Sequence, residues 1–160
     1  MRIIGIDPGT GILGFGVIEV TIQSKVTLVD AGVIRTPVKE DDAVRLLTIY
    51  EELTDIIAST KPQEMAVEKL FFAQNVTTAM TVAQARGVIL LCGMQNGMKI
   101  AEYTPLQIKQ ALTGYGRADK KQIQEMVRVH LALKETPKPD DCADALAAAI
   151  CHSTHTQTSI

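Results

Sequence analysis

The sequence predicts an α/β fold in which a mixed sheet of five strands is flanked by α-helices. The first 36 residues carry three apolar runs separated by short polar turns, which is typical of an antiparallel meander. Longer segments with apolar residues at helical spacing then alternate with two further short apolar runs. A strand that follows a helix lies parallel to a neighbour, so the sheet contains both strand directions.

The chain is long enough for one domain with a substantial core, since 46% of its 160 residues are hydrophobic and 21% charged. We expect this domain to span residues 1–152 and a flexible polar tail to follow at 153–160. The net charge of −2 gives no overall indication of a nucleic-acid partner, although a local basic face is compatible with it. Three cysteines without a CxxC pair, no signal peptide and no apolar segment long enough to span a bilayer predict a reduced, cytoplasmic protein without a membrane.

The first strand is a short apolar run, Ile3–Ile6, that ends at the carboxylate of Asp7. A carboxylate at the end of a buried strand is costly unless a cation or a hydrogen-bond donor meets it. Asp7 is therefore the first candidate site residue. A Pro-Gly-Thr-Gly turn follows, and the next two strands are expected at Ile12–Thr21 and Val26–Thr36.

Helices follow the meander. The first is capped by Asp41 or Asp42, ends at Lys61-Pro62 and carries apolar residues at helical spacing. Those apolar positions are Leu46, Leu47, Tyr50, Leu53 and Ile57. The remaining helices are expected at Val76–Gln95, at Leu106–Leu112, at Lys120–Leu133, and from Asp140 or Asp141 to about His152.

Two more strands lie between these helices, at Glu64–Glu68 and Met98–Tyr103. The first of them again ends in a carboxylate. If this strand is the parallel neighbour of the N-terminal strand, the carboxyl ends of both strands meet and Asp7 faces Glu68.

The helix at Val76–Gln95 carries a stripe of mostly small residues, Ala79, Ala83, Gly87 and Leu90. Such a stripe lets another helix or a sheet approach closely. The sequence leaves open whether this stripe is an internal packing face or a dimer seam.

Two further acids, Asp141 and Asp144, lie three residues apart at the start of the last helix and therefore share one helix face. If that helix packs over the strand ends, both acids meet Asp7 and Glu68. Hard divalent cations such as Mg²⁺ or Mn²⁺ resolve the repulsion in such a cluster, and two ions about 4 Å apart are the usual arrangement for phosphodiester hydrolysis. Asp140 is interpreted as a helix N-cap, although it competes with Asp141 as the ligand.

Candidate DNA-binding residues lie around the Gly-Tyr-Gly loop at 114–116 and just after the fourth strand. Glycines beside cationic side chains allow a phosphate to approach the backbone, and lysine supplies a point charge for it. An exposed aromatic residue stacks on bases or wedges between them, and the sequence offers Phe71 or Phe72 for this role. The basic candidates are Lys109, Arg117, Lys120 and Lys121.

The chain closely resembles the RuvC family of bacterial Holliday-junction resolvases. The resemblance rests on GIDPGT at 5–10, VEKLFFAQN at 67–75, QARG at 84–87, GYGRADK at 114–120 and DCADALAAAICH at 141–152. These motifs occur in matched order and spacing from about Arg2 to His152, and the set is far more specific than the DPG turn alone.

The resemblance implies an RNase H-like fold and a homodimer that nicks two strands of a four-way DNA junction symmetrically, with Mg²⁺ or Mn²⁺. Carried over by motif, Asp7, Glu68, Asp141 and Asp144 are the metal ligands and catalytic acids. Phe71 matches the family's aromatic residue at the junction centre, and Lys109 and Lys120 match its basic positions near the scissile phosphate. The family works with the RuvA and RuvB branch-migration complex, which is therefore the expected partner.

Three alternatives remain at this point. The DPGTGILGFG segment is also similar to the phosphate-binding hairpin of actin-like ATPases, but these need two such domains around the nucleotide. A YqgF-type relative acting on RNA is a second alternative, which the long helix at 76–95 fits less well. A catalytically silent junction-binding scaffold is the third, and retention of all four acids argues against it.

Overall fold

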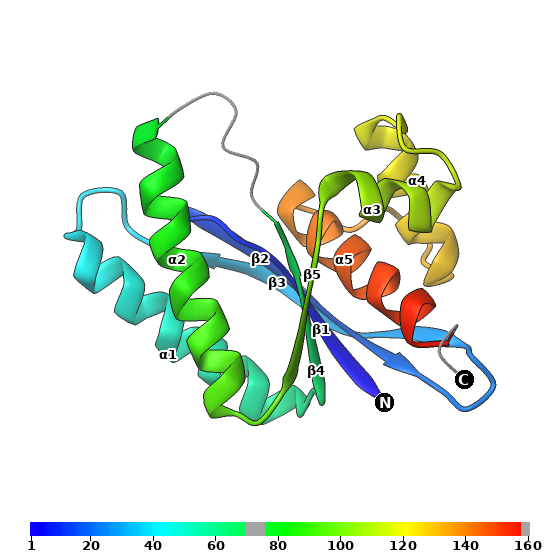
Figure 1. Ribbon diagram of the computed structural model, residues 1–160, viewed down its shortest axis with the longest axis horizontal. Helices are drawn as coiled ribbons and strands as arrows, with labels where there is room; N and C mark the ends of the chain where they lie inside the picture. The colour runs from blue at the N-terminus through cyan, green and yellow to red at the C-terminus, as the bar shows by residue number, and fades with distance from the viewer. Residues whose placement is uncertain (70–75, 158–160) are drawn as a thin grey trace.

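The computed structural model describes residues 1–69 and 76–157 and contains a five-stranded sheet in the order β3-β2-β1-β4-β5 (Figure 1). Strands β1 and β2, and β2 and β3, pair antiparallel, whereas β4 pairs parallel with both β1 and β5. The predicted mixed sheet is therefore confirmed. The strands are β1 Arg2–Asp7, β2 Ile12–Val20, β3 Val26–Arg35, β4 Glu64–Glu68 and β5 Lys99–Tyr103.

Two layers of helices cover the two faces of this sheet (Figure 1). Helices α1 (Asp42–Thr60) and α2 (Val76–Gln95) cover one face, and α3 (Pro105–Thr113), α4 (Lys120–His130) and α5 (Asp140–Gln157) cover the other. Alternation along β1 separates two cores: Ile4 and Ile6 pack with α1 and α2, while Ile3 packs with the other three helices.

Side-chain caps define the starts of α3 and α4. The side chains of Thr104 and Asp119 accept hydrogen bonds from the N–H of Gln107 and Gln122, and both pairs form complete capping boxes. Asp41 occupies the N-cap position of α1 without a side-chain cap bond. The capping motifs therefore fix where α3 and α4 begin.

The apolar face of α1 differs from the prediction in one residue. Leu53 and Ile57 are buried as expected, but Leu47 is 54% exposed and Ile49 is buried instead. Lys61, in a left-handed conformation, ends the helix where the Lys-Pro pair predicts. The buried face is thus rotated slightly from the one chosen by spacing alone.

The ends of α4 and α5 differ from the prediction. Helix α4 ends at His130 rather than Leu133, because Ala132 has a φ of 51° and the turn brings Leu131 into the core at 5% exposure. Helix α5 continues to Gln157, so its predicted end near His152 is wrong, while residues 158–160 of the predicted tail lie outside the described residues. Ser153 is 1% exposed and belongs to the core-facing side of this helix.

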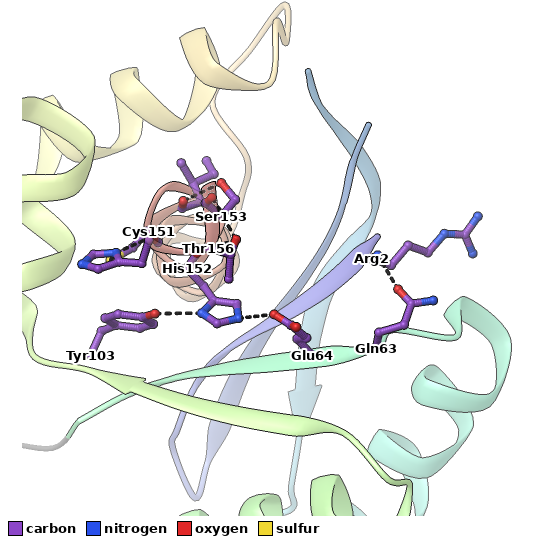
Figure 2. Close-up of polar contacts among 10 residues, drawn as sticks. Arg2, Gln63, Glu64, Tyr103, Cys151, His152, Ser153 and Thr156 are labelled. Atoms are coloured by element: carbon purple, nitrogen blue, oxygen red, sulfur yellow. Dashed lines mark hydrogen bonds and ion pairs between the residues drawn. The ribbon is translucent and has the colours of Figure 1, made fainter. Parts of the chain in front are cut away.

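A buried polar chain accounts for the longer α5 (Figure 2). His152 Nδ1 lies 2.7 Å from the Tyr103 hydroxyl, and its Nε2 lies 2.6 Å from Oε2 of Glu64. Burial raises the pKa of Tyr103 to about 12, so its hydroxyl stays protonated. The chain joins the last turns of α5 to β4 and β5, and no metal role is needed to explain His152.

Replacing His152 by leucine is expected to lower the free energy of unfolding by about 3 kcal/mol, because it leaves the partly buried Glu64 carboxylate and the buried Tyr103 hydroxyl without their partner. Thermal denaturation measures the effect as a fall in Tm of roughly 9 °C. The control is His130→Leu on the exposed end of α4. Equal losses in the two variants would contradict the structural role given to His152.

Helix α2 is the one described helix that is long and apolar enough to cross a membrane by length and composition, contrary to the expectation that every apolar segment is too short. Its buried residues, Ala85, Ile89, Cys92 and Gly93, pack in the core, and Arg86 forms an ion pair with Glu102 of β5. A helix tied to the sheet in this way needs no membrane to explain its apolar core-facing side. Val88 and Leu90 also pack against the core, whereas Val76, Met80, Leu91 and Met94 are exposed.

Candidate active site

Asp7 and Glu68 end two neighbouring parallel strands. In the β1–β4 register Ile6 pairs with Val67, which places the next residue of each strand at the same edge of the sheet. Burial and the charge of Glu68 raise the pKa of Asp7 to about 8, and burial and the charge of Asp144 raise that of Glu68 to about 7. The predicted meeting of the two strand-end carboxylates is therefore present in the fold.

Two glycines bring the backbone of α5 against the sheet. A Cβ atom built on Gly14 would lie 2.0 Å from the carbonyl oxygen of Asp141, and one built on Gly5 would lie 1.9 Å from that of Ala145. Gly14 is also the β2 partner of Asp7. The absence of side chains at these positions thus allows the first turn of α5 to lie beside the end of β1.

Asp144 and Asp141 reach the same edge from α5. Burial is the largest cause that raises the pKa of Asp144, and Lys120 opposes the shift. The charges of both residues contribute to the raised pKa of Asp7. The four acids predicted from strand ends and helix spacing are therefore close enough to perturb one another.

Asp140 points elsewhere, so its interpretation as an N-cap is wrong. It is the first residue of α5, and its carboxylate accepts a hydrogen bond from Gln124 at 2.9 Å and lies 3.2 Å from Lys120 Nζ. Its charge raises the pKa of Asp144 less than the charge of Asp141 does, and Asp141 also raises the pKa of Asp7. This arrangement favours Asp141 over Asp140 as a member of the acid cluster.

A cavity of about 210 Å³ lies beside the acids, between β4 and helices α3, α4 and α5. Two acids, two lysines and four apolar residues line it. Its lining residues are Glu68, Pro105, Ile108, Lys109, Lys120, Ile123, Asp144 and Ala147. It has room for a small charged group next to the carboxylates.

The donor chemistry of the acid cluster fits a hard divalent cation, because buried carboxylates that raise one another's pKa need either protons or metal ions to balance their charge. Within the described residues no three acid, histidine or cysteine side chains are arranged around one ion position. Lys120 supplies a cation to the cluster, with its Nζ 3.6 Å from Asp144. The residues that would hold a metal are Asp7, Glu68, Asp141 and Asp144.

The acid cluster is expected to destabilise the metal-free protein at neutral pH. The unfolded Asp7 ionises near pH 3.8, whereas the folded one keeps its proton until about pH 8, so stability falls as pH rises between these values. In the presence of a chelator at pH 7.5, Asp7→Asn should therefore raise the free energy of unfolding by about 2 kcal/mol, or roughly 6 °C in Tm.

The increase in the free energy of unfolding of Asp7→Asn should shrink towards pH 4. It should also shrink in saturating Mg²⁺, which stabilises the wild type but not the variant. Asp55→Asn, at an exposed position of α1, is the control and should show no gain. Thermal denaturation over pH and metal concentration checks both points. A variant less stable than wild type in chelator at pH 7.5 would contradict the electrostatic account.

The predicted basic residues lie on α3, α4 and the loop between them. Lys109 and Lys120 line the cavity and lower the pKa of Glu68, whereas Lys121 and Arg117 are exposed. Phe71, the predicted stacking residue, and its alternative Phe72 lie outside the described residues.

One role in this site was missed at the sequence level. Lys120 was assigned to phosphate binding, but its Nζ also pairs with Asp140 and Asp144 and so links α4 to the start of α5. The adjacent capping residue Asp119 fixes where α4 begins, yet no local pattern indicates which acid Lys120 meets. Only the packing of α4 on α5 reveals the pair.

The family model described as crossover junction endodeoxyribonuclease RuvC matches residues 3–152. The chain belongs to the RuvC family. RuvC of Heliobacterium modesticaldum is 57% identical over 151 residues, covering 94% of this chain and 93% of that protein. RuvC of Caldicellulosiruptor saccharolyticus is 53% identical over 152 residues, which cover 95% of this chain and 92% of that protein.

Solved structures agree with this assignment. Thermus thermophilus RuvC is 35% identical with a TM-score of 0.92 and covers 99% of this chain and 97% of its own. The structure of the same protein in complex with a Holliday junction substrate is 34% identical with a TM-score of 0.90. The match covers 99% of this chain and 96% of that one. The yeast mitochondrial Holliday junction resolvase, at 13% identity and a TM-score of 0.69, shares the fold. The chain is thus an RNase H-like, Holliday-junction-resolving endonuclease of the RuvC family, and the YqgF-type and actin-like alternatives are not favoured. Divalent-metal dependence is a general property of this family.

Proposed function

We propose that the four acids Asp7, Glu68, Asp141 and Asp144 are the catalytic residues and hold Mg²⁺ or Mn²⁺, two ions per active site. The observation that carries the proposal is their convergence at one sheet edge beside a cavity lined by lysines. When bound, the ions would activate the attacking water and stabilise the leaving oxygen of a phosphodiester.

Residues of α3 and α4 position the DNA in this proposal. Lys109 and Lys120 flank the cavity next to Glu68 and Asp144, where a phosphate would replace part of the pairing of Lys120. Lys121 and Arg117 extend the cationic surface outside the cavity. Phe71 is assigned to the junction centre on its motif alone.

We further propose that two copies act together, because a four-way junction has a two-fold axis and paired nicks fall on opposed strands. The described part of α2 supports this: Met80 is 65% exposed, Leu91 55% and Met94 64%, and they follow one helix face with Gly87 between them. An apolar face of this kind fits a second copy of the same helix.

Leu91→Glu is expected to shift the protein from dimer towards monomer and to lower junction cleavage by about 10-fold or more at low protein concentration, because each buried glutamate would lack a partner. Analytical ultracentrifugation measures the oligomeric state. The control is Val129→Glu on α4, at 53% exposure. A Leu91→Glu protein that stays fully dimeric would show that the dimer interface lies elsewhere on the protein.

A junction-cleavage assay tests the proposed activity. End-labelled four-way junction and linear duplex of the same sequence are incubated with the protein and Mg²⁺, Mn²⁺ or chelator. Symmetric nicks in two opposed strands of the junction, with little cutting of the duplex and none in chelator, are expected. Equal cutting of duplex, or cutting in chelator, would contradict the proposal. Cytoplasmic localisation and the partnership with RuvA and RuvB stay predictions.

A further inference from the structure

The turn that follows Asp7 is held by a buried threonine from beyond the end of β3. Thr36 is 5% exposed. Its N–H donates to the carbonyl oxygen of Gly11 at 3.0 Å, and its hydroxyl donates to the carbonyl oxygen of Thr10. One residue therefore fixes two successive carbonyl groups of the β1–β2 turn.

Arg45 of α1 fixes the direction of these bonds. Its Nε donates to Oγ1 of Thr36 at 3.0 Å, and a guanidinium has no acceptor. The single hydroxyl proton of Thr36 is therefore free to point at Thr10. The guanidinium also lies beside the turn itself, since a Cβ atom built on Gly11 would be 3.6 Å from Nη2.

A third contact comes from α2. The hydroxyl of Thr10 donates to Oγ1 of Thr81 at 3.2 Å, and the Thr81 hydroxyl donates in turn to the carbonyl oxygen of Thr78 at 3.0 Å. The hydroxyl and the carbonyl oxygen of Thr10 are thus both hydrogen-bonded. The turn is bonded to the residue after β3 and to α2, and through Thr36 to α1.

We propose that Thr36 and Arg45 are positioning residues that hold the β1–β2 turn so that Asp7 keeps its place among the other three acids. Asp7 is the last residue of its strand, and the turn begins at the next residue. Because productive sites hold their groups within about 0.5 Å, hydrogen bonds that fix the turn also limit the movement of Asp7. The inference rests on the proposed role of Asp7.

The test replaces Thr36 by valine, which keeps the shape and removes both hydroxyl bonds. The Mg²⁺ concentration for half-maximal junction cleavage is expected to rise about 5–10-fold, with junction affinity in chelator unchanged. Thr36→Ser should restore the wild-type Mg²⁺ dependence. Independently of activity, the rise in Tm produced by a fixed, subsaturating Mg²⁺ concentration should shrink in the valine variant.

Thr60→Val is the matched control. Thr60 is 6% exposed, and its hydroxyl donates to the carbonyl oxygen of Ile56 at the end of α1, beside the start of β1 rather than its end. It should lower Tm without changing the Mg²⁺ dependence. If Thr36→Val behaves in the same way, Thr36 is structural only and the proposal is overturned.

Two further variants keep the outcome decisive. If Thr36→Val does not fold, Arg45→Lys, which retains the charge but lacks the Nε–H, should shift the Mg²⁺ dependence in the same direction by a smaller factor. An unchanged Arg45→Lys protein would overturn the proposal. An Asp7→Asn protein that cleaves normally would instead overturn the role of Asp7, so the two failures are distinguishable.

Discussion

An Asp7→Asn variant is expected to cleave a four-way junction at least about 10³-fold more slowly than the wild type in saturating Mg²⁺. The amide keeps the size of the side chain but removes the negative charge that the cluster offers to a cation. Asp7 is the acid whose pKa the charges of the other three carboxylates all raise, so it interacts with each of them. Single-turnover cleavage of an end-labelled junction measures the loss.

Junction binding by this variant should stay within about 3-fold of wild type when measured in chelator, because the lysines of α3 and α4 are unchanged. Asp55→Asn, at an exposed position of α1, should cleave normally and controls for loss of any acid. Cleavage by Asp7→Asn at a near-normal rate would remove Asp7 from the catalytic set. Loss of binding together with cleavage would point to misfolding rather than to lost chemistry.

The core of this site is predictable because it depends on strand order and local spacing. An apolar run that ends in Asp7 and another that ends in Glu68 become neighbours once the intervening helix requires a parallel pair. The spacing of Asp141 and Asp144 fixes their common face on any helix. The fold adds which face of α5 is buried, and this choice brings the two pairs of acids together.

Other features depend on long-range register and are invisible in local patterns. Thr36 reaches the β1–β2 turn because Ile12 pairs with Arg35, and no motif near residue 36 indicates that pairing. Likewise, α5 extends to Gln157 because His152 meets partners on β4 and β5, whereas the polar sequence there is typical of a frayed end. In both cases tertiary contacts override the local pattern.

A Gly14→Ala variant is expected to lose about 3 kcal/mol of unfolding free energy and to cleave about 10²-fold more slowly at a temperature where it remains folded. The added methyl group would lie 2.0 Å from the carbonyl oxygen and 2.5 Å from the carbonyl carbon of Asp141, far inside contact distance. Since the obstacle is helix backbone, the first turn of α5 must move away from β2. Asp141 and Asp144 would then retreat from Asp7, the strand partner of Gly14.

Gly32→Ala separates this displacement from a general effect of changing a glycine in the sheet. A Cβ atom at Gly32 meets the Phe15 ring at 3.0 Å and no part of α5, so the variant should lose at most about 1 kcal/mol and cleave normally. Tm, cleavage rate and Mg²⁺ dependence are compared for both proteins. If Gly14→Ala loses stability but keeps the wild-type rate and Mg²⁺ dependence, the position of α5 does not set the acid cluster. If Gly14→Ala loses both stability and cleavage rate, the absence of a side chain at Gly14 is what allows Asp141 and Asp144 to lie close to Asp7 and Glu68.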